Sequence, residues 1–193
     1  MNARIIHSTE ELDEVLQSCK AKPISEPTPG GNFYHIMSQQ FTFPDGSIVT
    51  REFVEKRKAT VVVPIMEDGS YVFVVQPISL SREGVLMQFP AGYVEKDESG
   101  EQGGLRELAE ETGYTTDEPL TYVGDFYQDP GCIKQTVDIY IARNCRRTTE
   151  QSLDKDEYII PVEIPKDIVA TLIDKGYIRD ANTFIALQKS LLA

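Results

Sequence analysis

The sequence has no tryptophan, only two histidines and three cysteines, and no apolar run of the length that spans a membrane. His7 and His35 stand alone, which favours surface or core histidines over metal ligands. Cys19, Cys132 and Cys145 are odd in number and show no CxxC spacing. We therefore expect free thiols in a reducing compartment.

Basic residues are also fewer than acidic ones. The chain has 19 Lys and Arg and 31 Asp and Glu, which gives a net charge of −12. This balance argues against nonspecific nucleic-acid binding, which depends on a positive field. The start, MNARIIHSTEELDEV, has acidic residues by position 10 and no apolar segment of signal length. We expect a cytoplasmic protein with neither a nucleic-acid nor a membrane partner.

The remaining composition is that of an ordinary globular chain. Its 193 residues are 40% hydrophobic and 26% charged. This length suffices for one domain with a sizeable core, with or without a small appendage.

The first part of the chain contains signals for one helix and one β-hairpin. A helix is expected over 10–20, with Ser8 and Thr9 as candidate caps. The Pro and Gly residues of PISEPTPGG predict a linker or turn. FYHIMSQQFTF and SIVTREFVEK predict a hairpin over 33–56, turned at Pro44-Asp45-Gly46. So short a sheet is marginal by itself and needs a partner surface.

In the rest of the chain, apolar strand patterns alternate with helix patterns, which favours an α/β fold. The expected strands span 59–66, 71–76, 85–89, 120–127, 135–142 and 158–163. Two late helices are expected over 165–175 and 181–192, the first of them starting with Pro as helices often do.

One further helix carries three glutamates on one side. In LRELAEETG, residues 105–113, the apolar positions recur at helical spacing and leave Glu107, Glu110 and Glu111 together. Like charges a turn apart repel each other. Such a face is either open to water or holds a cation, and carboxylate oxygens suit Mg2+ or Mn2+. The helix pattern alone leaves both interpretations open.

The signals at the helix ends are clear, but its interior is unusual. Ser99-Gly100-Glu101-Gln102 predicts a capping box, and Gly113 predicts a left-handed stop. Gly103 and Gly104 lie inside, where each glycine costs about 1 kcal/mol relative to alanine. They are either merely tolerated or mark a place where another group comes close.

The whole stretch resembles the Nudix box. Gly92 is followed after five residues by Glu98, and after seven more by Arg106-Glu107-Leu108; Glu110-Glu111 and Gly113-Tyr114 complete the pattern. Only Tyr114 departs, since an aliphatic residue is more usual there. The resemblance implies an α/β/α sandwich that hydrolyses a nucleoside diphosphate joined to a further group, with residues 58–193 as the Nudix domain and 1–57 as a helix and β appendage.

The resemblance also implies roles for individual residues. Glu107 and Glu111 are expected metal ligands, Glu110 a further ligand or water holder, and the Ala91 carbonyl another ligand. Glu98 and Arg106 are expected to form the ion pair that fixes the loop on the helix, and Gly92 to border the substrate. These roles fit the chemistry, because divalent ions neutralise a diphosphate and activate water.

Outside the box, the chain resembles the ADP-ribose pyrophosphatase branch of the family. Pro130, in Gln128-Asp129-Pro130-Gly131, lies where that branch has a proline near the terminal ribose; an ordinary turn is the alternative. The hairpin resembles a sheet that in this branch swaps across a dimer. We therefore expect a homodimer, with a monomeric appendage packed on its own domain as the alternative.

The acidic loop before residue 158 resembles the mobile loop that carries a catalytic glutamate in this branch. Glu157 is the expected general base, because a carboxylate one water away from phosphorus would suit that role. A plain solvated loop is the rival interpretation. Glu150, Asp154 and Asp156 are the substitutes.

Two departures concern the substrate. The branch commonly has Gln-aromatic-Arg where this chain has Gln76-Pro77-Ile78, so a cation is missing, and Arg82 is the candidate replacement. In some relatives, tryptophans of the amino-terminal sheet sandwich the adenine. Phe33 and Arg51 occupy the matching places here and could stack on a base.

We therefore predict metal-dependent hydrolysis of the diphosphate bond of ADP-ribose, or of a similar nucleoside diphosphate sugar, to AMP and ribose 5-phosphate. The alternatives are GDP-mannose or another nucleotide sugar as substrate, and a non-catalytic nucleotide sensor. Sensors usually lose box carboxylates, and this chain has lost none.

Overall fold

The computed structural model describes residues 3–21, 34 and 36–193. The predicted linker over 23–31, Phe33 and His35 lie outside the described residues. All three cysteines are free, with Cys19 and Cys145 buried and Cys132 exposed. No helix in the described part of the chain is long and apolar enough to cross a membrane.

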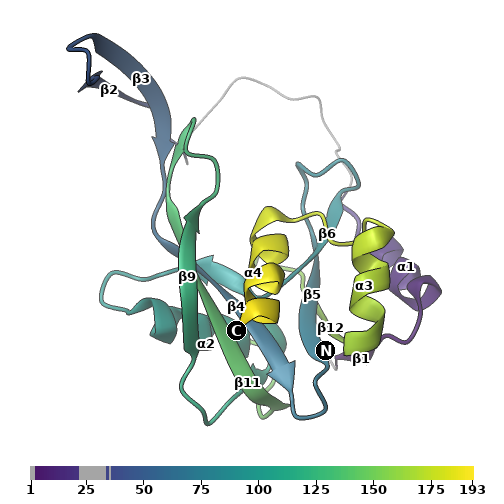
Figure 1. The fold of residues 1–193 in the computed structure, drawn as a ribbon. Coiled ribbons are helices and arrows are strands. Elements are labelled where there is room, and N and C mark those ends of the chain that lie inside the picture. The colour runs from purple at the N-terminus through teal and green to yellow at the C-terminus, as the bar shows by residue number, and fades with distance from the viewer. Residues whose placement is uncertain (1–2, 22–33, 35) are drawn as a thin grey trace.

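A mixed sheet of nine strands forms the body of the molecule (Figure 1). Its strands are β1 (Arg4–Ile5), β4 (Ala59–Met66), β5 (Tyr71–Pro77), β6 (Val85–Gln88), β7 (Ala91–Tyr93), β8 (Tyr114–Thr115), β9 (Thr121–Tyr127), β11 (Thr136–Arg147) and β12 (Ile160–Ile164). The order is β1-β12-β5-β4-β11-β8, with β6 beside β5, β7 beside β4 and β9 beside β11.

Helices cover both faces of this sheet, as predicted (Figure 1). The helix α2 (Gly100–Thr112) packs on one face through a small core that includes Leu108 and Val62. The other face carries α1 (Thr9–Ser18), α3 (Lys166–Asp174) and α4 (Ala181–Leu192) over the main core. The two cores follow from strand alternation, because neighbouring residues of a strand point to opposite faces.

The predicted hairpin forms a separate small sheet that projects from the body (Figure 1). It consists of β2 (Ile36–Thr42), β3 (Ile48–Glu55) and β10 (Ile133–Lys134), in the order β10-β3-β2. At the turn, Ser47 N–H donates to the Asp45 carboxylate at 2.9 Å. Gly46 has a φ of 82°, which glycine adopts without strain.

Several element boundaries differ from the sequence-based prediction. The helix α1 ends at Ser18 rather than residue 20, and β12 starts at Ile160 rather than 158. The strand β11 continues to Arg147 instead of stopping at 142, through a register shift near Asn144, which has a φ of 51°. The strands β1, β7, β8 and β10 were not predicted, because two or three residues show no alternation and their partners alone define them.

Among the described residues of the predicted appendage 1–57, the hairpin stands apart from the body and the helix α1 does not. Ile6, Leu12 and Val15 belong to the main core, and β1 pairs in parallel with β12. The division at residues 57 and 58 remains a prediction.

Candidate active site

The helix α2 is held by the capping box that the sequence predicts. Ser99 Oγ accepts from the Gln102 N–H at 3.1 Å, and Gln102 Oε1 accepts from the Ser99 N–H at 2.8 Å. At the other end, Gly113 adopts a left-handed conformation with a φ of 77°. Both ends are therefore fixed, which sets the rotation of the helix and the direction of its glutamates.

The interior glycines of α2 lie where other groups come close. A Cβ on Gly104 would approach Val62 Cγ2 to 2.8 Å, and one on Gly103 would approach Glu98 Oε2 to 3.0 Å. These contacts leave little room for a side chain, which explains two helix-weakening residues in one turn. The structure therefore supports the interpretation that Gly103 and Gly104 mark places where other groups come close, rather than that they are merely tolerated.

Gly92 is required for a similar reason. It lies in β7, opposite Thr60 of β4, and a Cβ there would overlap the Glu107 carboxyl group. The Glu107 carboxylate thus lies directly over the backbone of β7 at Gly92.

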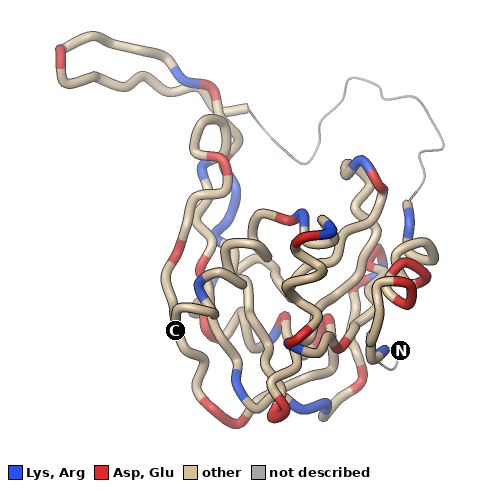
Figure 2. Tube along the Cα trace, turned by 45° about the vertical axis from the view of Figure 1, so that its right-hand side comes forward, with Lys and Arg blue, Asp and Glu red and all other residues tan. Residues whose placement is uncertain are grey.

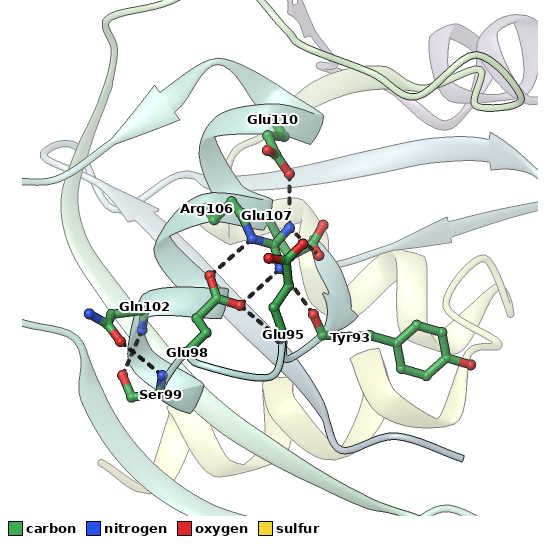
Figure 3. Close-up of polar contacts among 8 residues, drawn as sticks. All are labelled: Tyr93, Glu95, Glu98, Ser99, Gln102, Arg106, Glu107 and Glu110. Carbon is green, nitrogen blue, oxygen red and sulfur yellow. Dashed lines mark hydrogen bonds and ion pairs between the residues drawn. The ribbon is translucent and has the colours of Figure 1, made fainter.

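The guanidinium of Arg106 joins the loop to the helix, as Figure 3 shows. It binds both oxygens of Glu98 at 3.0 and 3.1 Å and the Tyr93 carbonyl at 2.9 Å. Its Nη1 also donates to Glu107 at 2.8 Å and Glu110 at 2.9 Å. The expected pair of Glu98 and Arg106 is therefore part of a larger network.

These contacts shift the protonation equilibria of the network. The hydrogen bond from Arg106 holds the pKa of Glu98 below its usual value. The bond to Glu98, joined by those to Glu107 and Glu110, raises the pKa of Arg106. Arg106 therefore stays positively charged under all ordinary conditions.

Glu111 is the most buried of the glutamates, with 4% of its surface exposed. Its Oε2 accepts from the Ala91 N–H at 3.1 Å. Burial, followed by the negative charge of Glu107, raises its pKa well above the ordinary value. Burial also raises the pKa of Glu107, with contributions from Glu110 and Glu157 that Arg106 opposes.

The loop that carries Glu157 is attached to the end of α2. Gln151 Nε2 donates to the carbonyl oxygens of Glu111 at 2.6 Å and Ile159 at 3.2 Å, and Ser152 N–H donates to the Glu110 carbonyl at 3.0 Å. The charge of Glu157 reaches Glu107 and Glu111, since it raises the pKa of both.

Of the substitutes for Glu157, Glu150 is engaged elsewhere. Its carboxylate accepts from Arg147 at 3.3 Å and is largely exposed. Asp154 donates its N–H to Glu157 Oε2 at 3.0 Å, which helps to orient that carboxylate. Asp156 makes no described contact with the box glutamates.

The donor set fits a hard divalent cation. Every candidate ligand is a carboxylate or carbonyl oxygen, which suits Mg2+ or Mn2+. Buried Glu111 accepts an N–H but has no described cationic partner. Over residues 3–21, 34 and 36–193, no three acidic, His or Cys side chains already converge as a metal-binding group. Glu107 and Glu110 are instead bonded to Arg106.

A second feature is a groove of about 760 Å³ between the hairpin and the segment that follows β9. Both Arg51 and Pro130 line it, so the structure brings two predicted substrate contacts together. Its aromatic side chains are Phe41, Phe53 and Tyr127.

The charge of this groove differs from that of the whole chain. Its lining contains more basic than acidic side chains, and the basic ones are Arg51, Lys56, Lys58 and Lys134. Figure 2 shows Lys and Arg at the base of the hairpin. Lys58 pairs with Asp138 at 2.6 Å and Lys134 with Glu55 at 2.7 Å, so the positive charge that favours an anionic ligand here is that of Arg51 and Lys56.

The NUDIX domain model matches residues 55–184. The chain belongs to the Nudix family. An ADP-ribose pyrophosphatase of Bacillus subtilis is 30% identical over 90% of this chain and 94% of its own length. The methanol dehydrogenase activator of Bacillus methanolicus is 30% identical over 82% and 85%. A GDP-mannose pyrophosphatase of Cronobacter sakazakii is 26% identical over 79% and 84%.

Solved structures agree on the fold. The crystal structure of an ADP compounds hydrolase superposes with a TM-score of 0.72, at 21% identity, over 88% of this chain and 95% of that one. The predicted α/β Nudix fold is therefore confirmed.

Arg82 and Phe33 are the remaining predicted substrate contacts of this Nudix chain. Arg82 lies in the loop between β5 and β6, and no described contact connects it to the groove or to the carboxylates. Its neighbour Glu83 pairs with Arg179. Phe33 lies outside the described residues.

Sequence reasoning missed two groups at the site. Phe41 and Phe53 share the groove-facing side of the hairpin with Arg51, and strand alternation contained that signal. Thr183 Oγ1 accepts from the Phe89 N–H at 2.9 Å and so attaches α4 to the chain before Ala91. No sequence pattern indicated that contact.

Proposed function

We propose that this Nudix protein hydrolyses the diphosphate bond of ADP-ribose, or of a similar nucleoside diphosphate sugar. The products would be AMP and ribose 5-phosphate. The observation that carries the proposal is the complete set of glutamates around Arg106, with Glu111 buried against Ala91. The name of the Bacillus subtilis relative supports the choice of substrate.

Glu107, Glu110 and Glu111, together with the Ala91 carbonyl, are the groups that would hold Mg2+ or Mn2+. A bound divalent ion neutralises the diphosphate and activates the attacking water. Glu98 and Arg106 keep the loop before α2 in place. Gly92 leaves the space in which the Glu107 carboxylate lies.

Glu157 is the proposed general base. Its loop is tied to α2 through Gln151 and Ser152, while its own side chain remains exposed. An exposed carboxylate beside the buried glutamates is placed to accept a proton from water.

The groove is the proposed site for the nucleoside. Arg51, with Phe33, would stack on the base, and Pro130 would shape the wall near the terminal ribose. Phe41 and Phe53 add aromatic surface in the absence of tryptophan. Arg82 is the proposed phosphate contact in place of the missing strand cation.

We further propose a homodimer, located in the cytoplasm. The hairpin exposes large apolar side chains that its own body leaves uncovered: Ile36, Met37, Phe41, Phe43 and Ile48. A projecting apolar hairpin of this kind marks a contact surface.

GDP-mannose, or another nucleotide sugar, is the second candidate substrate. It is favoured by the missing cation after Gln76 and by the GDP-mannose pyrophosphatase among the relatives. A non-catalytic sensor is the alternative from a different functional class.

Product analysis with Mg2+ and with Mn2+ tests the proposal. ADP-ribose, GDP-mannose, a dinucleoside polyphosphate and nucleoside triphosphates are offered side by side. AMP and ribose 5-phosphate should dominate, and Glu111→Gln should abolish turnover while Glu14→Gln, an exposed change on α1, leaves it intact. Preferred cleavage of GDP-mannose would favour the second substrate, and no metal-dependent cleavage would favour a sensor.

A further inference from the structure

Gln76 and Gln88 lie on the face of the main sheet that carries α2. Val72 of β5 packs into the small core beneath α2, whereas Phe73 packs into the main core on the opposite face. Gln76 is an even number of residues from Val72 and therefore points to the α2 side. Gln88 of β6 is directly opposite Val74, so it points to the same side.

The two amides form an isolated pair. Gln76 Nε2 donates to Gln88 Oε1 at 3.1 Å, and both residues are partly buried. In the part of the chain that the structure describes, neither side chain has another hydrogen-bond partner. The pair thus retains one amide group that donates and one carbonyl that accepts. A concerted flip of both amides exchanges these roles and leaves the same two groups.

The pair also lies near the catalytic carboxylates. Gln88 precedes Ala91, the residue whose N–H binds Glu111, by three positions. Gln76 follows Val75, which is opposite Ile160 of β12. Gln151 joins the backbone carbonyl of Glu111 to that of Ile159, which attaches the chain just before β12 to the last turn of α2, and β5 also lies close to α2.

We propose that the Gln76 and Gln88 amides bind a hydroxyl of the sugar attached to the distal phosphate. A sugar hydroxyl both donates and accepts, so it satisfies both free groups of the pair, whereas phosphate oxygens only accept. Neutral amides also add no charge beside Glu107 and Glu111. The pair would make the site specific for nucleoside diphosphate sugars over bare nucleoside diphosphates, an inference that rests on the proposed function.

Equilibrium binding tests this role. Calorimetry with Ca2+ in place of Mg2+ compares ADP-ribose with ADP, and GDP-mannose with GDP, for the wild type and for Gln88→Met. Gln88→Met should weaken binding of the preferred nucleotide sugar about tenfold, the effect of one to two lost hydrogen bonds, and leave the bare diphosphate unchanged. Gln188→Met, an exposed change on α4, should alter neither affinity.

Each other outcome overturns the inference. An equal loss for sugar and bare nucleotide would indicate a structural or phosphate-binding role, and no loss would exclude the pair from recognition. Gln76→Met provides the same comparison if Gln88→Met fails to fold. Hydrolysis is measured separately, so a wild type that binds nucleotide sugars through this pair without cleaving them would refute the proposed function alone.

Discussion

The position of the Glu107 carboxylate depends on a single residue, because Gly92 has no side chain that would occupy the same space. Gly92→Ala would drive a Cβ into the Glu107 carboxyl group. We expect metal affinity to fall and kcat to drop about 100-fold, since a misplaced group near the chemistry costs this much. Mn2+ titration and turnover measure both.

Gly131→Ala is the matched control for metal affinity. A Cβ there would meet Asp129 Oδ1 at 3.4 Å, an ordinary contact, and Gly131 lies in the groove rather than at the carboxylates. Unchanged Mn2+ affinity in Gly92→Ala would show that Glu107 does not hold the ion in the way we propose.

Glu111 gives the metal-free protein a characteristic pH dependence. Its pKa is raised by burial and by Glu107, so the folded state binds this proton more tightly than the unfolded state. The free energy of unfolding therefore falls as the pH rises from the ordinary carboxyl range through the raised pKa. With EDTA near pH 7.5, Glu111→Gln should raise Tm by about 4 °C, corresponding to roughly 1–2 kcal/mol.

Saturating Mg2+ should reverse this order. A bound ion stabilises only the folded wild type, and its contribution grows with pH as Glu111 ionises. Thermal melts of both proteins across pH, with EDTA and with Mg2+, supply the comparison. A wild type whose Tm follows that of Glu111→Gln at every pH would contradict a raised pKa of the buried Glu111 carboxylate.

At this scale the sequence was most informative where a function needs fixed residue types at fixed spacing. The spacing of Glu107, Glu110 and Glu111 placed them on one helix face without any structure. Of the five hydrogen bonds of Arg106, the sequence predicted those to Glu98. The bond to the Tyr93 carbonyl could not be predicted, because it depends on how the backbone runs from β7 to α2. The aromatic groove residues required knowledge of which hairpin face meets the body.

Among the elements, α4 is hydrogen-bonded to the chain before the box through the Thr183 side chain. Thr183 is fully buried, accepts from the Phe89 N–H and donates to Asp180 at 2.8 Å. Thr183→Val should destabilise the protein by about 2 kcal/mol, because it leaves a buried N–H unpaired. Thermal and chemical denaturation measure the loss.

Thr183→Ser is the rescue variant, since it keeps the hydroxyl and removes only a methyl group. It should retain most of the stability. If the serine and valine variants lose equally, packing rather than the hydrogen bond attaches α4 to the chain at Phe89.

Long elements were predictable and short ones were not, for a physical reason. The strands β4 and β5 are long enough to show their apolar character, and α2 has capping signals at both ends. The strand β10 has two residues, and it exists because Val54 N–H finds the Cys132 carbonyl at 2.9 Å. That pairing attaches the Pro130 segment to the hairpin, a connection that no local pattern could indicate.

For the whole molecule, we propose that the hairpin forms the contact between two copies of the chain. Ile36 and Ile48 lie on the hairpin face opposite the one that lines the groove, as the strand pairing shows, and are 73% and 66% exposed. We expect a particle of twice the 21.7 kDa chain mass in light scattering. Ile48→Lys should convert it to single chains, because a buried lysine would lack a partner.

The same substitution tests whether the dimer completes the groove. If a partner hairpin helps to form the wall of the base pocket, Ile48→Lys should raise KM about tenfold with little change in kcat, because the α2 carboxylates are untouched. Leu192→Lys, at a terminal side chain that is 85% exposed, is the control and should change neither mass nor KM. A wild type that scatters as a single chain would instead make the hairpin an appendage of its own domain. The base would then have to bind within one copy of the chain, against Arg51 and the aromatic side chains that line the groove.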